Sequence, residues 1–226
     1  MTAPPTATNP PLICWNCHER TLGTHFCPGC GKLLQLPQAV DYFALFEMPR
    51  KLWVEMNGLE QKFLQLSWKL HPDNFVNATE QEREFSLKRS SELNDAYRTL
   101  RDPVARVEYL LGIEGARKDG EHKQHAPPEL LEEVFELNES LDELREAKAS
   151  GDDLAALRSR LESAEKSFQE KLCEVDAQLQ AAAREWDAAL QDDHATRKKI
   201  MAQLNELLNR RSYIRNLVTN VQKELL

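Results

Sequence analysis

The sequence predicts an all-α fold preceded by a small metal-binding segment. Only 8 of the 226 residues are glycine, about half the usual share of ~7%, which favours long helices over strands and tight turns. From residue 129 to the C-terminus there is no proline and a single glycine, and the apolar residues recur at steps of three and four. Four of the five cysteines lie within 17 residues near the N-terminus, which asks for a local explanation.

The charge distribution excludes some classes of partner. The net charge is −8, and residues 129–193 hold 19 acidic and 7 basic side chains. Nucleic acid is therefore not expected as a partner, because phosphate binding needs a basic face. No stretch approaches the roughly 18 apolar residues of a membrane helix, so we expect no membrane span. Residues 1–11 lack the features of a targeting signal, which favours a disordered lead and a cytoplasmic protein.

Residues 12–37 contain two C-x-x-C pairs, Cys14 with Cys17 and Cys27 with Cys30. Two residues between the cysteines let both thiolates of a pair reach one ion from a tight turn. Two pairs complete a tetrahedral sulfur site with no open position, so we predict one structural Zn²⁺ per chain. Iron in the same site remains an alternative, as does a thiol oxidoreductase that uses Cys14 and Cys17.

The remaining histidine, cysteine and basic residues considered as candidates are not expected to bind a metal ion or nucleic acid. His18 and His25 are interpreted as exposed loop residues, because four thiolates already complete the coordination sphere. Cys173 falls on the apolar side of a predicted helix and is expected to be buried. Arg20 and Lys32 are too few bases for a zinc ribbon that binds nucleic acid.

The segment before residue 71 predicts a helix that ends in an exposed turn. Its apolar residues form a core stripe: Leu59, Phe63, Leu66 and Leu70. Lys62 and Lys69 share the opposite side of this helix. Pro72 cannot continue the helix and disfavours α geometry at His71, so His71, Pro72 and Asp73 stand at a sharp bend. A second helix, from about residue 79 to 100, would pair antiparallel with the first across this turn.

These residues resemble the J domain of J-protein co-chaperones, and more narrowly the HscB family of iron–sulfur cluster assembly. The likeness rests on four runs: Asp41–Phe46, Leu70–Asp73, Leu93–Pro103 and Arg106–Leu111. It covers about residues 40–226, and the four-cysteine segment resembles that of the longer, eukaryotic-type family members. Gly58 departs from the family pattern and could start the lysine-bearing helix late.

The domain organisation follows from this resemblance and from the helical periodicity. We expect a metal-binding segment at 12–37, a J-domain helical hairpin at 38–112, a linker at 113–127 and an antiparallel three-helix bundle at 128–226. Within the bundle, Gly151 is expected to end the first helix, and a break at 192–194 to separate the second from the third.

The resemblance implies a co-chaperone that has no catalytic residue of its own. In the family, the His-Pro-Asp loop docks on a DnaK/HscA-type chaperone and stimulates its ATP hydrolysis. This assigns His71, Pro72 and Asp73 as the trigger and Lys62 and Lys69 as electrostatic docking contacts. A solvated charged face is the alternative interpretation of the two lysines. A general J protein for unfolded clients is the alternative function, which the acidic bundle and the absence of a Gly/Phe-rich linker disfavour.

The resemblance also implies that the C-terminal bundle binds an IscU-like cluster scaffold protein. The matching residues are Leu131, Phe135, Glu136, Glu139 and Glu143 on the first bundle helix and Phe168 on the second. Leu131 and Phe135 lie outside the main apolar stripe and are flanked by acids, as expected of an exposed docking patch. A wider core stripe is the alternative for these two, and Phe168 fits the core stripe of its helix equally well.

Overall fold

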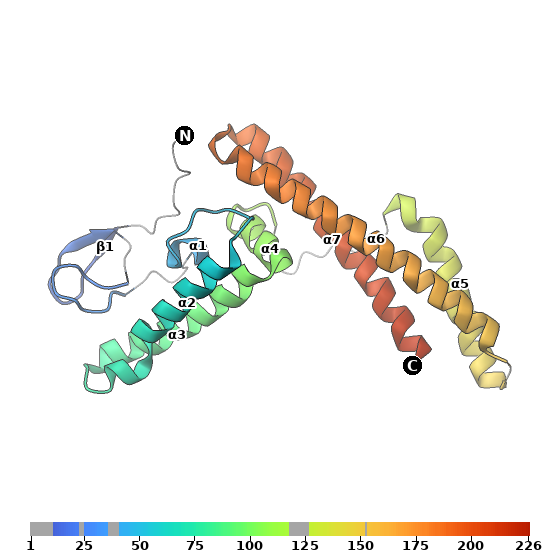
Figure 1. The fold of residues 1–226 in the computed structure, drawn as a ribbon, viewed down its shortest axis with the longest axis horizontal. Helices are drawn as coiled ribbons and strands as arrows, with labels where there is room; N and C mark the ends of the chain where they lie inside the picture. The colour runs from blue at the N-terminus through green and yellow to red at the C-terminus, as the bar shows by residue number, and fades with distance from the viewer. Residues whose placement is uncertain (1–10, 23–24, 36–40, 118–126, 152) are drawn as a thin grey trace. The chain divides into compact units, whose positions relative to one another are not determined.

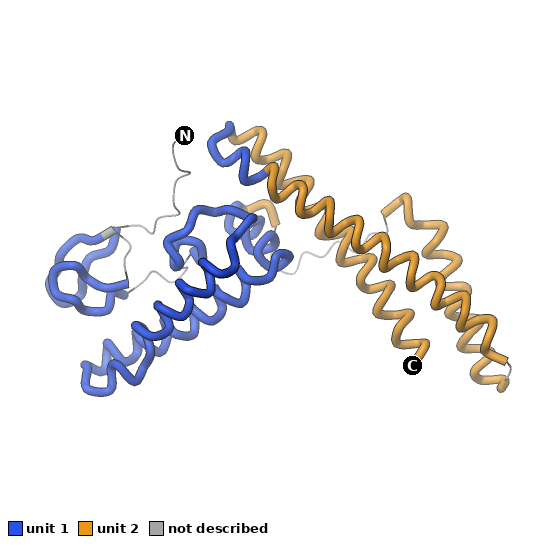
Figure 2. Tube along the Cα trace, viewed as in Figure 1, with its two compact units in different colours: residues 1–114, 186–193 blue, residues 115–185, 194–226 orange. Residues whose placement is uncertain are grey.

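The computed structural model describes residues 11–22, 25–35, 41–117, 127–151 and 153–226 (Figure 1). It confirms the predicted all-α class, with one small sheet near the N-terminus of the described chain. The chain forms two compact units (Figure 2): unit 1 comprises residues 1–114 and 186–193, and unit 2 comprises residues 115–185 and 194–226. Residues 1–10 of the expected lead and 118–126 of the expected linker lie outside the described residues. None of the helices in the described ranges is long and apolar enough to cross a membrane.

Unit 1 contains the predicted helical hairpin. Its helices are α1 (Tyr42–Leu45), α2 (Met56–Leu70), α3 (Glu80–Arg101) and α4 (Pro103–Ile113), with the 3-10 turn η1 (Pro72–Phe75) between α2 and α3. Helices α2 and α3 lie side by side and antiparallel (Figure 1). The rings of Phe63 and Tyr97 stack with centroids 4.1 Å apart, and the Ser86 hydroxyl of α3 donates to the Leu70 carbonyl at the end of α2. Buried apolar side chains from all four helices form the core, among them Phe43, Leu45, Leu59, Leu93, Leu100 and Leu110.

Side-chain caps fix where these helices begin. The Thr79 hydroxyl accepts from the backbone N–H of Glu82 at the start of α3. The Glu55 carboxylate caps α2 by accepting from the N–H of Gly58 at 2.7 Å. Helix α2 therefore begins at Met56, and Gly58 does not delay it as the sequence suggested it could. A side chain at residue 58 would meet the Glu55 carboxylate, so glycine at this position leaves room for the cap.

The four-cysteine segment folds around two short strands that the sequence analysis did not predict. Strands β1 (Pro11–Ile13) and β2 (Arg20–Leu22) pair antiparallel, with Leu12 opposite Thr21. Three-residue strands have too few alternating positions to stand out from loop sequence. The segment has a small core of its own, made of Cys14, Cys27 and Leu34.

Unit 2 is built from three long helices, which confirms the predicted bundle. They are α5 (Leu131–Ser150), α6 (Ala155–Ala188, of which residues to 185 belong to this unit) and α7 (His194–Leu225), and α5 is preceded by the 3-10 turn η2 (Pro128–Leu130). Ion pairs join each pair of helices: Lys171 to Glu133, Arg211 to Asp176 and Arg145 to Glu224. Gly151 ends α5 in the left-handed region, at φ 80°, as its position in the sequence predicts.

Residues 186–193 belong to unit 1, where two side chains bind the backbone that leads into α2. The Asp187 carboxylate accepts from the N–H groups of Leu52 and Trp53, at 2.7 and 2.8 Å. The indole of Trp186 is buried and donates to the carbonyl of Arg50 at 2.9 Å. The 3-10 turn η3 (Ala189–Gln191) follows directly.

Candidate functional site

The His-Pro-Asp turn stands at the end of α2, where its side chains face solvent. The side chains of His71 and Asp73 are 56% and 85% exposed. His71 is the C-cap of α2, and Pro72 opens η1. The backbone N–H of Asp73 donates to Nδ1 of His71 at 3.3 Å, and the Asp73 carboxylate lies 3.5 Å from the same nitrogen. The imidazole and the carboxylate are therefore presented together.

Contacts from both hairpin helices hold this turn in place. Leu70, immediately before it, is fully buried, and its carbonyl accepts from the hydroxyls of Ser86 and Ser90 on α3. The side-chain amide of Asn74 donates back to the carbonyl of Trp68 at 2.6 Å. Because these bonds satisfy carbonyls at the end of α2, the turn is fixed before any partner arrives.

The two candidate docking lysines lie in different environments. Lys69 is exposed in the last turn of α2, two residues before His71, where a cation is also favoured by the helix dipole. Lys62 is half-buried, and its ammonium donates to the carbonyls of Phe46 at 2.7 Å and Glu47 at 3.2 Å. Lys62 thus ties α2 to the end of α1, a role that the helical pattern alone could not reveal.

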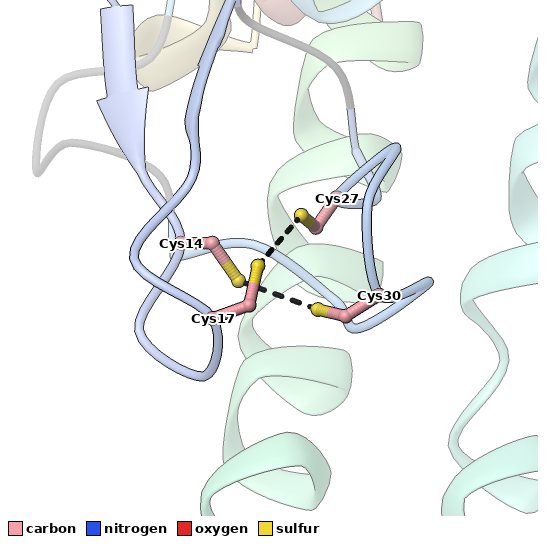
Figure 3. Close-up of side chains that lie close together, drawn as sticks. All are labelled: Cys14, Cys17, Cys27 and Cys30. Carbon is pink, nitrogen blue, oxygen red and sulfur yellow. Dashed lines mark hydrogen bonds between the residues drawn. The ribbon is translucent and has the colours of Figure 1, made fainter.

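The four cysteines converge on one point, as the spacing predicts (Figure 3). The sulfur atoms of Cys14 and Cys30 lie 3.6 Å apart, those of Cys17 and Cys27 3.5 Å apart, and all four lie within 4.8 Å of one another. Tetrahedral zinc with Zn–S bonds of about 2.3 Å would separate its sulfur atoms by about 3.8 Å. The donor set and its spacing therefore fit a tetrahedral metal ion.

Each cysteine pair sits on a backbone turn of the same design. The N–H of His18 donates to the Cys14 carbonyl, and the N–H of Gly31 donates to the Cys27 carbonyl, at 2.9 and 2.8 Å. Both residues take positive φ, 60° at His18 and 71° at Gly31. Glycine at residue 31 marks this conformation in the sequence, whereas histidine at residue 18 hides it.

The four-cysteine segment packs on the helical hairpin through a buried polar cluster. The Arg89 guanidinium, from α3, donates to the carbonyl of Leu34 at 2.6 Å and to Nδ1 of His25 at 3.2 Å. Nε2 of His25 contacts the carbonyl of Leu45, the last residue of α1, at 3.0 Å. Because a guanidinium has only donors, Nδ1 accepts and the proton is on Nε2. Burial, and then the charge of Arg89, lower the pKa of His25 to about 4, so this ring is neutral at pH 7.

The prediction that His25 is an exposed loop residue is therefore wrong, although His18 is exposed as expected. His25 is 8% exposed because the contact surface with the hairpin covers it. An ion pair of 2.8 Å between Lys32 and buried Glu82 strengthens the same contact, as does the edge-to-face packing of Trp15 on Phe85. The metal-binding segment is thus an integral part of unit 1.

Replacing Arg89 with methionine is expected to destabilise unit 1 by about 2 kcal/mol, because it leaves the Leu34 carbonyl and Nδ1 of His25 buried without a donor. Urea denaturation of the metal-loaded protein measures the change. Arg98→Met is the matched control on α3, because the Arg98 side chain is 81% exposed, and it should cost less than about 0.5 kcal/mol. Equal stability of the two variants would contradict the structural role of Arg89.

Helix α5 of unit 2 carries the candidate scaffold patch. Leu131 is 54% exposed and Phe135 is 70% exposed, so both lie outside the core. A hollow of about 620 Å³ between α5 and α6 is lined by Glu136, Glu139 and Phe168, among others. Helix α5 therefore carries both an exposed aromatic ring, that of Phe135, and several acidic residues.

Two of the predicted scaffold residues are less available to a partner. Phe168 is only 2% exposed, so it contributes mainly to the core beneath the hollow. The Glu143 carboxylate is bound by Arg160 of α6 at 2.9 Å. Exposure therefore favours Leu131 and Phe135 as apolar contacts, whereas Phe168 belongs to the core.

The chain is similar in sequence to curated co-chaperones. The chain is 31% identical to "Co-chaperone protein HscB homolog" of Vibrio vulnificus (strain YJ016) over 169 residues, 74% of this chain and 95% of that protein. It is also 31% identical to the protein of the same description from Vibrio cholerae (strain O395), over 171 residues, 76% of this chain and 96% of that protein. No family model matches the chain.

Two solved structures have the same fold. The crystal structure of human co-chaperone protein HscB superimposes with a TM-score of 0.63 at 26% identity, covering 93% of this chain and 96% of that one. The chaperone HscB from Vibrio cholerae superimposes with a TM-score of 0.51, covering 81% of this chain and 96% of that one. At 24% identity the second likeness supports the fold alone.

Proposed function

Because the chain belongs to the HscB family of co-chaperones, which are not enzymes, we propose that it couples two partner proteins through two separate surfaces. The first partner is a DnaK/HscA-type chaperone, whose ATP hydrolysis the His71–Asp73 turn stimulates. The second is an IscU-like scaffold protein of iron–sulfur cluster assembly, which binds helix α5. The observation that carries this proposal is the exposed, pre-fixed His-Pro-Asp turn at the end of a lysine-bearing helix.

The chaperone surface acts by binding, since the turn offers an imidazole and a carboxylate to a partner rather than to a substrate. The two groups are mostly solvent-exposed, so a chaperone can reach both without rearranging unit 1. Lys69 adds an exposed cation beside them, which would steer an acidic chaperone surface toward the turn. Lys62 contributes mainly by fixing α2 against α1.

The direct test is the ATP hydrolysis rate of a DnaK/HscA-type chaperone at increasing concentrations of the full chain. The proposal predicts a saturable rise in the rate, and a further rise when an IscU-like scaffold is present. A rate that stays at its basal value at saturating chain concentration would refute the proposed function.

The scaffold surface is the exposed face of α5. Leu131 and Phe135 supply the apolar contacts, and Glu136 and Glu139 supply a negative rim that would attract a basic scaffold surface. Residues 129–193, most of which belong to this unit, carry an excess of acidic side chains, so the negative potential extends beyond the rim. An apolar centre with a charged rim is the usual anatomy of a reversible protein interface.

Replacing Phe135 with alanine is expected to weaken scaffold binding by about 1–3 kcal/mol, because a 70% exposed aromatic ring is available to anchor a partner. Isothermal titration calorimetry with the scaffold measures the change. Leu87→Ala, which removes a 60% exposed apolar side chain from α3 of unit 1, is the control and should leave the affinity unaltered. An unchanged dissociation constant for Phe135→Ala would remove this residue from the interface.

The metal held by Cys14, Cys17, Cys27 and Cys30 is Zn²⁺ with a structural role. Four thiolates fill a tetrahedral sphere and leave no place for a substrate, and when bound the ion supplies the cross-link that a segment with a three-residue core lacks. The compartment in which the chain acts is the cytoplasm, which its bacterial relatives favour.

A further inference from the structure

A groove of about 390 Å³ runs between the four-cysteine segment and the helical hairpin of unit 1. Phe26 and Pro28 of the four-cysteine segment form one wall, and Lys62 and Lys69 of α2 line the other. The apolar side chains of Leu45, Phe46 and Leu66 also line it. Lys69 lies two residues before His71, so the lysine wall ends close in sequence to the turn.

The two walls are held in position by contacts that need no partner. Arg89 and His25 link the cysteine segment to α3 and to the end of α1 through buried hydrogen bonds. The ammonium of Lys62 fixes the opposite wall to the carbonyls of Phe46 and Glu47. The groove is consequently formed in advance, which lowers the entropic cost of binding.

The lining sets the chemistry of the occupant. Two basic residues, Lys62 and Lys69, and one acidic residue, Glu47, line the groove. The groove is therefore positive and has an apolar lining, which suits an extended segment with acidic and apolar side chains. The groove contains Lys69, which lies beside the proposed chaperone contact at His71. A chaperone that binds the turn therefore has its neighbouring segments close to the groove, which favours the chaperone over the acidic unit 2 as the source of the occupant.

We propose that this groove binds an acidic, partly apolar segment of the chaperone, so that the four-cysteine segment forms part of the chaperone-docking surface. The inference rests on the proposed co-chaperone function and extends it. The inference also gives the metal a second role. The folded cysteine segment supplies the wall that contains Phe26 and Pro28, so the metal that folds the segment also preserves the docking surface.

A negative charge on the cysteine wall tests this directly. Pro28 is exposed and has no backbone N–H to lose, so Pro28→Glu places a carboxylate opposite the two lysines without breaking a hydrogen bond. The chain concentration that gives half-maximal stimulation of the chaperone ATPase is expected to rise about tenfold, with the maximal stimulation retained. Gln35→Glu adds the same charge at an exposed position of the same segment outside the groove, and should leave that concentration unchanged.

A second variant guards against damage to the metal site next to Pro28. Phe26→Leu makes the wall smaller without adding charge and leaves the backbone bridge between residue 26 and Leu33 intact, so the half-maximal concentration should rise about threefold. Metal content, measured on each preparation, should remain about one ion per chain. If the chain with intact metal stimulates the chaperone and both variants match it, the groove is not part of the docking surface, although the proposed function stands.

Two other outcomes would also overturn the inference. If the unaltered chain fails to stimulate the chaperone at all, the proposed function fails and the inference fails with it. If the chain self-associates in sedimentation experiments, and Pro28→Glu abolishes this association without affecting chaperone stimulation, the groove binds a second copy of the chain.

Discussion

Replacing His71 with glutamine is expected to return chaperone ATP hydrolysis to its basal rate while scaffold affinity stays the same. The imidazole is 56% exposed and accepts the N–H of Asp73 at Nδ1, so its substitution changes the presented surface and the turn that supports it. The expected loss is more than about 2 kcal/mol of docking free energy, or roughly thirtyfold in affinity, as at a central interface residue. Single-turnover ATP hydrolysis measures the stimulation, and calorimetry measures scaffold binding.

His194→Gln is the matched control for this variant. His194 is an exposed histidine at the start of α7, outside both proposed surfaces, and its substitution should alter neither measurement. Stimulation that survives in the His71 variant would remove the turn from the mechanism. A joint loss of stimulation and scaffold binding would mean that the two surfaces are not separate.

Loss of the metal is expected to unfold the four-cysteine segment and to lower the thermal stability of unit 1. Cys27→Ser removes one of the two fully or nearly fully buried thiolates, and metal content should fall from about one ion per chain to nearly none. The segment would then lose the contacts through Arg89 and Lys32 that hold it on α3. The unfolding midpoint of unit 1 should fall by about 10–15 °C, because these contacts are worth about 3 kcal/mol.

Cys173→Ser is the control, because Cys173 is an exposed cysteine on α6 of unit 2. It should retain the metal and the midpoint. Differential scanning calorimetry with elemental analysis of the same samples decides the question. If Cys27→Ser lost its metal but kept the unit 1 transition unchanged, the segment would be an appendage rather than a part of unit 1.

The long helices could be predicted from the sequence because their signals are redundant. Apolar steps of three and four recur over many turns in α6 and α7, Gly151 marks the end of α5, and the break after residue 191 separates α6 from α7. The same periodicity placed Cys173 on the buried side, which is wrong, since Cys173 is exposed. Whether a residue near the edge of an apolar stripe is buried depends on how the other helices pack against it, and the periodicity of a single helix does not contain this information.

The metal site could also be predicted from the sequence, because its ligand pairs are local. The buried contact between the cysteine segment and the hairpin could not, because it joins His25 to Arg89, 64 residues apart. Neither residue carries a local pattern, and a buried arginine that donates to a carbonyl and an imidazole is not expected from sequence. Lys62 was identified as a docking residue from its helical side, but its bonds to α1 depend on the tertiary fold.

The most direct test of the whole account is whether this chain joins its two partners in one complex. Fluorescence anisotropy of a labelled IscU-like scaffold, mixed with an ATP-bound DnaK/HscA-type chaperone, should rise to that of a three-way complex only when the chain is added. The account predicts that His71→Gln leaves a two-way complex of scaffold and chain, and that Phe135→Ala weakens capture of the scaffold. If the anisotropy of the labelled scaffold rose to the same level with the chaperone alone, without the chain, the result would contradict it.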